Sequence, residues 1–288
     1  IGTELVVALE AKHGRGSVIP TDVREAPNCR ILDVMDAEGI ISMVNDESVT
    51  DIYHLAALLS ATGERNPELC WKINVEGLEN IIAAAKANNC RIFAPSSIAV
   101  FGPDCPSIAP QVTPLNPSTV YGKTKVVCEQ LVMTSEVDIR GLRYPGLISY
   151  KAPAGGGTTD YAVEIFHAAL SEGHYTCFVR EDTRLPMMYM DDAIRATLEL
   201  MEVPAEKLGG ARGGYNIAGC SFTVGELVAS IERHLPEFTC TYEPDVRQKY
   251  ADSWPNDIDD DVARMEWGWN PEFDLDGMVD AMFAGLQA

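Results

Sequence analysis

Short apolar runs alternate with amphipathic stretches along most of the chain, and this alternation predicts strands and helices in turn. The expected strands are residues 17–22, 30–34, 51–54, 91–95, 138–143 and 215–218. The expected helices are residues 1–9, 37–44, 66–88, 161–170, 193–201 and 223–234. Strands that alternate with helices at this pace are typical of an α/β protein with a doubly wound parallel (Rossmann) sheet.

The alternation loosens after residue 150, which predicts a second and smaller α/β lobe. We expect residues 1–150, together with roughly 188–218, to form the sheet domain. Residues 151–187 and 219–288 then form the smaller lobe. Because ligands of such sheets bind at the carboxyl ends of the strands, we expect the turn 55–57, Ser96 and Ser97 to converge at one edge.

Tyr121 and Lys125 are four residues apart in a stretch predicted to be helical, so they share one helix face. Asn116 or Ser118 can cap this helix, and Pro117 suits its first turn. A free tyrosine has a pKa of about 10, and a neighbouring ammonium stabilises its phenolate. Such a pair can exchange a proton with an alcohol near neutral pH. Taken alone, the spacing is more typical of an ordinary surface helix, so the rest of the chain decides.

Gly2 and Asp22 are 20 residues apart. This is the distance between the last glycine of a dinucleotide fingerprint and the carboxylate that binds the adenosine ribose. That carboxylate would repel a 2′-phosphate, which favours NAD over NADP. The first strand and the first two glycines of such a fingerprint do not appear, and we expect this strand to be missing from the sequence.

Composition excludes several classes of function. The chain carries 22 Lys and Arg against 43 Asp and Glu, a net charge of −21, which argues against nucleic acid and acidic membranes as partners. No apolar run approaches the ~18 residues of a membrane span, and no secretory signal is visible. The eight cysteines form no Cys-x-x-Cys pair and no cluster with the five histidines. This pattern predicts reduced thiols, an intracellular protein and no metal site.

Three motifs together resemble the extended short-chain dehydrogenase/reductase (NAD-dependent epimerase/dehydratase) family: Ser97, Tyr121-x-x-x-Lys125 and Arg143-Tyr144-Pro145-Gly146. Further segments are similar to the L-threonine 3-dehydrogenase branch of that family. These are Ala57-Leu58-Leu59-Ser60, Pro95-Ser96-Ser97-Ile98, Gly155-Gly156-Gly157-Thr158-Thr159-Asp160-Tyr161 and Leu185-Pro186-Met187-Met188-Tyr189. The resemblance covers nearly the whole chain, and the last two segments separate this branch from nucleotide-sugar enzymes.

The resemblance implies NAD-dependent oxidation of the C3 hydroxyl of L-threonine to 2-amino-3-oxobutanoate, carried out by an NAD-binding sheet domain and a substrate-binding lobe. It implies Tyr121 as the base, Lys125 as a ligand of the nicotinamide ribose, and Ser97 as a hydrogen-bond donor to the reacting oxygen. The implied cofactor-binding residues are Gly2, Asp22, Asp33, Val34, Leu55, Ala56, Ala57, Tyr121, Lys125, Tyr144, Pro145, Gly146 and Leu147. The implied substrate-binding residues are Ser60, Ser96, Ser97, Tyr121, Thr158 and Thr159.

The same resemblance implies a homodimer that is cytoplasmic in a bacterium or located in the mitochondrial matrix of a eukaryote. Besides the absent first strand, the chain departs from the branch in its short stretches at 22–33 and 125–138. It also has Ser97 where the branch more often has threonine.

Two alternatives stay open. A nucleotide-sugar epimerase or dehydratase would need clustered basic groups for a diphosphate, and Lys151, Arg180 and Arg184 form no cluster in the sequence. A non-catalytic NAD-sensing protein would tend to lose the tyrosine or the lysine, and both are present.

Overall fold

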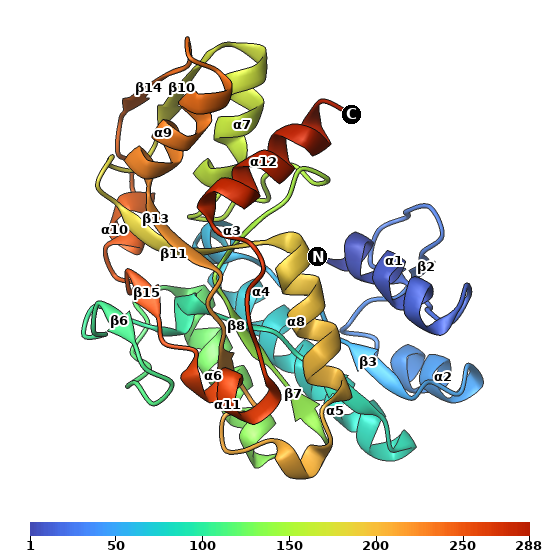
Figure 1. Ribbon diagram of the computed structural model, residues 1–288. Coiled ribbons are helices and arrows are strands. Elements are labelled where there is room, and N and C mark those ends of the chain that lie inside the picture. The colour runs from blue at the N-terminus through green and yellow to red at the C-terminus, as the bar shows by residue number, and fades with distance from the viewer.

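The computed structural model describes residues 1–288 and shows a larger lobe built on a parallel sheet (Figure 1). One ladder contains β3 (Asp51–Tyr53), β4 (Arg91–Phe93) and β7 (Ile139–Arg140). A second ladder contains β5 (Ser96–Ser97), β8 (Leu142–Tyr144) and β12 (Tyr215–Asn216). The chain passes directly from β4 to β5 and from β7 to β8, so the ladders continue one another. All of these strand pairs are parallel, which confirms the predicted fold class.

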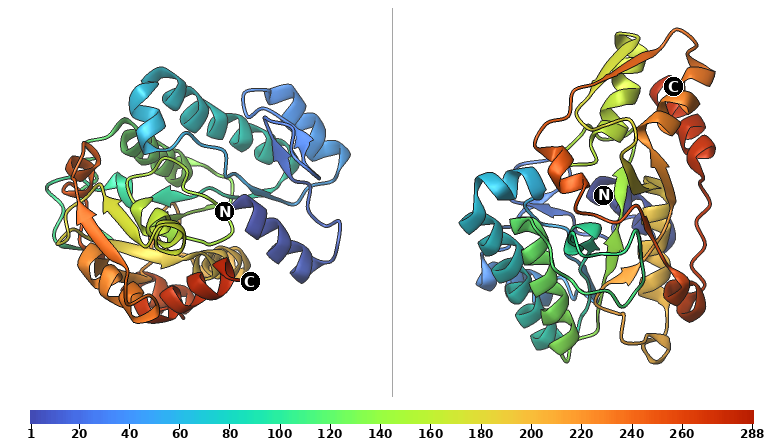
Figure 2. Two further views of the ribbon diagram at one scale, coloured as in Figure 1. Left: turned by 90° about the horizontal axis from the view of Figure 1, so that it is seen from above. Right: turned by 90° about the vertical axis from the view of Figure 1, so that its left-hand side faces the viewer.

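Helices cover both faces of this sheet, as the right-hand view of Figure 2 shows. The helices on one face are α2 (Ala37–Asp46), α5 (Gly77–Asn88) and α6 (Val120–Thr134), which pack around Ile92 and Ile139. Those on the other face are α1 (Gly2–His13), α8 (Met190–Glu202) and α11 (Asp261–Trp267), which pack around Phe93 and Leu142. The doubly wound arrangement follows from the apolar stripe that each helix presents to the strands.

The amino-terminal strands form a sheet of their own. β1 (Thr21–Asp22) pairs in parallel with β2 (Arg30–Ile31), and no strand lies between this pair and β3. Both strands are shorter than the predicted ranges 17–22 and 30–34. Helix α1 precedes both strands in the chain.

The long helix predicted at 66–88 is interrupted by a wider turn. It consists of α4 (Pro67–Trp71), a π-helical turn at Lys72–Glu76, and α5. Asn74 lies in the π-helical turn, and its side-chain amide binds the main-chain N–H and C=O of Leu58 at 2.8 and 3.1 Å. It also donates to the Thr124 hydroxyl at 3.0 Å. The turn that follows β3 is thereby tied to α6.

The smaller lobe has its own core of 25 buried residues and lies at the top of Figure 1. Its strands are β9 (Gly146–Ile148), β10 (His174–Cys177), β11 (Arg184–Tyr189), β13 (Cys220–Thr223) and β14 (Thr239–Tyr242). Its helices are α7 (Tyr161–Ser171), α9 (Val224–His234), α10 (Arg247–Ala251) and α12 (Leu275–Leu286). Short strands β6 (Ile108–Ala109) and β15 (Asp257–Ile258) pair beside the larger lobe. The division into domains stays a prediction, and Ala263 and Trp269 pack in the core of the larger lobe.

Three absences bear on the sequence predictions. No helix has both the length and the apolar character that crossing a membrane requires. All eight cysteines are free thiols. No group of three or more His, Cys, Asp and Glu side chains is arranged so that it could hold a metal ion.

Candidate active site

The cap of helix α6 lies one residue after Ser118 and three after Asn116, the two predicted caps. Thr119 is the cap, and its hydroxyl accepts the N–H of Gly122 at 3.0 Å. The prediction of Asn116 or Ser118 was wrong because the Asn116 amide donates to Asp104 and the Ser118 hydroxyl pairs with Ser253. Pro117 lies before the helix and outside its first turn.

Tyr121 and Lys125 occupy one face of α6, as their spacing predicts, and this face is turned to the sheet. Their exposed fractions are only 9% and 8%. The Lys125 ammonium donates to the Pro95 carbonyl at 2.7 Å and lies 5.8 Å from the centre of the Tyr121 ring. The pair is therefore buried at the carboxyl end of β4, where the sheet predicts ligand binding.

Ser97 ends β5 and is paired in register with Tyr144 at the end of β8. Its hydroxyl is half-buried and accepts the N–H of Ala99 at 3.2 Å. The adjacent Ser96 is buried, and its hydroxyl donates to a carboxylate oxygen of Glu129 at 2.5 Å. Ser96 thus has a partner inside the protein, and its assignment as a substrate ligand stays a prediction.

The segment after β8 brings predicted cofactor and substrate residues into contact. The side chain of Tyr144 is buried, and its hydroxyl pairs with Thr197, so only its main chain is free for a ligand. A Cβ atom at Gly146 would lie 2.8 Å from a methyl carbon of Thr159 and 2.3 Å from the sulfur of Met187. Only glycine fits there, because Thr159 packs directly on this backbone.

The triple glycine lies over α3 (Ser60–Arg65), whose first residue is the predicted ligand Ser60. A Cβ atom at Gly155 would be 3.5 Å from Leu59, and the Asp160 carboxylate accepts the N–H groups of Gly156 and Gly157 at 2.6 and 2.7 Å. Burial raises the pKa of Asp160. The buried Thr158 hydroxyl has no hydrogen-bond partner in the protein. An unpaired buried donor of this kind fits a ligand that supplies the acceptor.

The residues predicted to bind the rest of the dinucleotide lie at the start of α1, in the turn 55–57 and at the end of β1. Gly2 begins α1, and a Cβ atom there would lie 3.6 Å from Leu55. A helix amino terminus beside the small-residue turn 55–57 suits a phosphate group. Asp22 ends β1, and the hydrogen bond from the Arg24 main chain lowers the pKa of its carboxyl. The Asp22 carboxylate is therefore ionised at neutral pH and fits ribose hydroxyls.

Asp33 and Val34 follow β2 at the same end. The Asp33 carboxylate accepts the N–H of Met35 at 2.9 Å. The Val34 carbonyl accepts the Asn80 amide at 2.9 Å, and its side chain would touch a Cβ atom at Gly77. This fixes the two residues against α5, beyond the end of β2.

Sequence reasoning missed His54 as part of the site, and it assigned no role to Asn74 or Glu129. His54 follows β3 and is buried. Burial, helped by the Lys125 charge, lowers the pKa of His54 to about 3, so its ring is neutral. The only sequence signal for Asn74 was a polar residue in an apolar helix, and Glu129 gave none.

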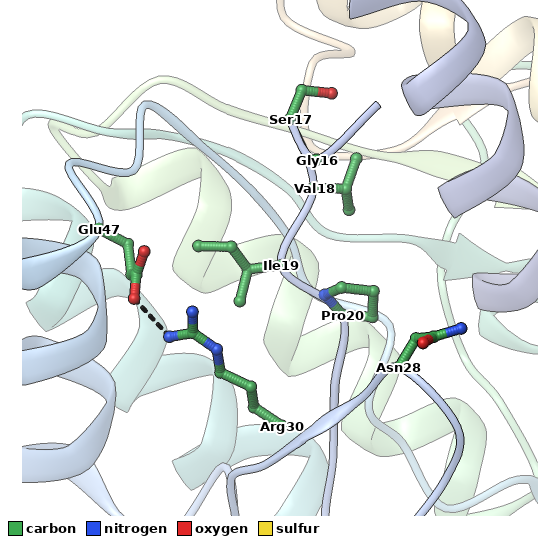
Figure 3. Close-up of a pocket in the computed structure, with 8 residues that line it drawn as sticks. All are labelled: Gly16, Ser17, Val18, Ile19, Pro20, Asn28, Arg30 and Glu47. Carbon is green, nitrogen blue, oxygen red and sulfur yellow. Dashed lines mark hydrogen bonds and ion pairs between the residues drawn. The ribbon is translucent and has the colours of Figure 1, made fainter. Parts of the chain in front are cut away.

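Two surface hollows lie apart from this site. One is a cavity of 460 Å³ lined by residues 16–20, which lead into β1, by Asn28 and Arg30 near β2, and by Glu47 at the end of α2. Figure 3 shows these residues and the ion pair between Arg30 and Glu47. The second has a volume of 830 Å³ and lies in the smaller lobe, where Arg180, Thr223 and Pro244 are among its lining residues. Neither is lined by Ser97, Tyr121 or Lys125.

Comparison with known proteins identifies the family of the chain. The model of the NAD dependent epimerase/dehydratase family matches residues 1–218. The chain belongs to this family. The predicted cofactor, NAD, is thereby confirmed. Among curated members, an uncharacterised epimerase/dehydratase from Staphylococcus haemolyticus is 42% identical over 301 residues, covering 100% of this chain and 94% of the relative.

Solved structures narrow the likeness within the epimerase/dehydratase family. A monomeric L-threonine 3-dehydrogenase from a metagenome is 49% identical with a TM-score of 0.95, covering 100% of this chain and 96% of that one. An L-threonine dehydrogenase from Cupriavidus necator in its holo form is 48% identical with a TM-score of 0.95, covering 99% and 96%. These matches confirm the resemblance to the threonine dehydrogenase branch. A nucleoside-diphosphate-sugar epimerase from Agrobacterium tumefaciens, 23% identical, shares the fold.

Removal of the Asp22 carboxylate tests the cofactor edge. We expect wild type to use NAD⁺ far better than NADP⁺, because the carboxylate binds ribose hydroxyls and repels a 2′-phosphate. Asp22→Ala should narrow this preference by at least about tenfold, measured as the ratio of the two kcat/KM values. Glu25→Ala removes an exposed carboxylate three residues away and should leave the ratio unchanged. Equal use of both cofactors by wild type would refute the assignment.

A methyl group at Gly146 tests the contact between the two predicted segments. Gly146→Ala must displace Thr159 or Met187, and a shift of about 1 Å near reacting groups lowers the rate by about a hundredfold. We expect kcat/KM for the substrate to fall by about tenfold or more. Gly210→Ala is the control, since nothing lies within 4 Å of its added methyl group. Equal rates for the two variants would contradict the close approach at Gly146.

Proposed function

We propose that this protein oxidises the C3 hydroxyl of L-threonine to a ketone, giving 2-amino-3-oxobutanoate and NADH. The observation that carries the proposal is the likeness to solved L-threonine dehydrogenases, which extends over the whole chain at 42–49% identity. A likeness of this extent includes both lobes, and hence the segments at 155–161 and 185–189 that separate the branch from nucleotide-sugar enzymes.

The catalytic roles follow from the face of α6. NAD⁺, when bound, supplies the acceptor for the hydride that leaves C3. Tyr121 takes the hydroxyl proton, and the Lys125 ammonium stabilises the phenolate and keeps donors free for the nicotinamide ribose after binding Pro95. Ser97 donates a hydrogen bond to the substrate oxygen as its charge changes.

Substrate binding involves the smaller lobe. Ser60 follows Leu59, which lies against Gly155 in the segment that contains Thr158 and Thr159. Thr159 in turn packs against Gly146. We infer that these hydroxyls orient the carboxylate and the ammonium of threonine beside the nicotinamide segment 144–147. The unpartnered hydroxyl of Thr158 supports this inference.

The two alternatives have less support. Each basic group that could hold a nucleotide diphosphate already has an acidic partner: Lys151 pairs with Glu4, Arg180 with Asp252, and Arg184 with Glu226. No free basic cluster remains in the smaller lobe for that substrate class. A sensing role without catalysis is not favoured, because Tyr121 and Lys125 are both in place.

The proposal also covers the oligomeric state and the cellular location of the protein. One similar enzyme is described as monomeric. We nevertheless infer a homodimer with a two-fold axis, because Leu69 and Trp71 are 47% and 38% exposed on α4 beside the α6 surface. The eight free thiols support an intracellular location, cytoplasmic in a bacterium or in the mitochondrial matrix of a eukaryote.

The substrate is tested with the purified protein and NAD⁺. We expect NADH to form with L-threonine, more slowly with other hydroxy-amino acids, and not with nucleotide sugars. NADH formation is followed by absorbance for each compound over a range of concentrations. Turnover of a nucleotide sugar in the absence of turnover with threonine would refute the proposal.

Tyr121→Phe tests the base. The change removes only the hydroxyl, so turnover should fall by about a hundred- to ten-thousand-fold, while the affinity for NAD⁺ stays near that of wild type. Steady-state rates and calorimetric titration with NAD⁺ provide the two measurements. Tyr242→Phe in β14 is the control and should keep full activity. If Tyr121→Phe retains more than about a tenth of the rate, Tyr121 is not the base.

The homodimer is tested by sedimentation. We expect a particle of about twice the 31.4 kDa chain mass at micromolar concentration. Trp71→Glu should convert it to a monomer by placing a charge in the apolar contact, whereas Val112→Glu, at a fully solvated position, should not. A wild-type particle of 31.4 kDa would contradict the dimer.

A further inference from the structure

A buried ion pair lies directly behind the candidate catalytic residues. Glu129 on α6 and Arg143 on β8 have exposed side-chain fractions of 9% and 8%. Two parallel bonds join them: Nε and Nη2 of Arg143 donate to the two carboxylate oxygens of Glu129 at 2.9 and 2.8 Å. The guanidinium stacks 5.4 Å from the centre of the Phe101 ring. Bidentate pairing of this kind fixes both the distance and the plane of the two groups.

The remaining hydrogen-bonding groups of the pair are also occupied. Arg143 donates from Nη1 to the Gln111 carbonyl and to the Asn216 side chain, each at 3.1 Å. Glu129 accepts the Ser96 hydroxyl. A Cβ atom at Gly214 would lie 2.5 Å from the Glu129 carboxylate, so the neighbouring strand approaches the pair as closely as glycine allows. The network is thus closed, with no free donor directed at a ligand.

Each end of the network is next to a residue of the reaction. Ser96 precedes Ser97, and Arg143 precedes Tyr144 in the paired strand. Glu129 follows Lys125 by one helical turn and Tyr121 by two, on the same face of α6. Lys125 donates to the Pro95 carbonyl, and Glu129 accepts the Ser96 hydroxyl. Helix α6 is thus bonded to two consecutive residues where β4 passes into β5.

A buried ion pair is not by itself a source of stability. Apolar residues of similar volume are often equally stable in its place, and in several proteins such a pair selects one arrangement among many. Here the arrangement selected is the registry of three elements that carry Ser97, Tyr121 with Lys125, and the nicotinamide segment that starts at Tyr144.

We propose that Glu129 and Arg143 are positioning residues for the oxidation, and that their ion pair sets Ser97 at working distance from the Tyr121 hydroxyl. The proposal rests on the threonine oxidation argued above. Neither side chain needs to touch the substrate. A misplacement of about 1 Å is enough to lower turnover by about a hundredfold.

The test compares two bidentate pairs, each between a buried arginine and a carboxylate. Glu129→Gln keeps the shape of the side chain and removes its charge. The control is Asp138→Asn, which alters the partner of Arg140, a buried arginine held by equivalent bonds of 2.9 and 2.7 Å. Arg140 lies in β7, three residues before Arg143 in β8, away from the carboxyl end of β5 where Ser97 lies.

Thermal unfolding, NAD⁺ affinity, KM and kcat are measured for both variants. We expect both to lose thermal stability, but only Glu129→Gln to lose kcat, by about tenfold or more, with NAD⁺ affinity within about twofold of wild type. Asp138→Asn should keep kcat within about twofold. An unchanged kcat in Glu129→Gln, or an equal loss in both variants, would overturn the proposal.

Ser96→Ala decides the question if Glu129→Gln does not fold. It removes one hydrogen bond and leaves the ion pair intact, and we expect kcat to fall by about threefold or more with KM for threonine unchanged. A rise in KM with kcat unchanged would assign Ser96 to substrate binding and overturn the proposal. If wild type does not oxidise threonine, only the proposed function fails. The variants are then compared on whichever hydroxy compound wild type does oxidise.

Discussion

The hydrogen bond from the Lys125 ammonium to the Pro95 carbonyl fixes α6 against the sheet. Pro95 lies between β4 and β5, and both strands are paired to neighbours, so its carbonyl is a rigid anchor. Tyr121 precedes Lys125 by one turn and Ser97 follows Pro95 by two residues. The positions of Tyr121 and of the neighbouring Ser97 hydroxyl therefore depend on this contact, together with the bond from the Ser96 hydroxyl to Glu129 on the same helix.

The site lies where the chain leaves one sheet and joins another. β8 pairs with β5 and β12 in the larger lobe, whereas β9 pairs with β11 in the smaller one. Only Pro145 separates them, and a residue without an N–H cannot continue the ladder. The next residue, Gly146, accepts Thr159 against its backbone. This change of sheet places residues 144–147 beside the segment that contains Thr158 and Thr159, although the smaller lobe has a separate core.

Features that depend on spacing along the chain were predicted better than features that depend on contacts between distant residues. The face shared by Tyr121 and Lys125 and the parallel sheet both follow from spacing along the chain. The cap of α6 did not, because Asn116 and Ser118 bind residues far from them in sequence. No strand was predicted at β11, where Pro186 lowers the strand propensity. Glu129 resembles an exposed helical glutamate, and only the folded chain brings Arg143, 14 residues later, to its carboxylate.

The candidate site holds a positive charge, that of Lys125, whereas the molecule as a whole is negatively charged. The chain has a net charge of −21, and two of its three buried cationic side chains, Arg140 and Arg143, have bidentate carboxylate partners. Lys125 has a carbonyl partner only, and the neighbouring His54 ring is neutral. A buried ammonium without a counter-charge is unfavourable, so this position favours an anionic group nearby. In the proposed reaction this unpaired charge lies beside the group that exchanges the proton, which is an arrangement that stabilises charge in a transition state.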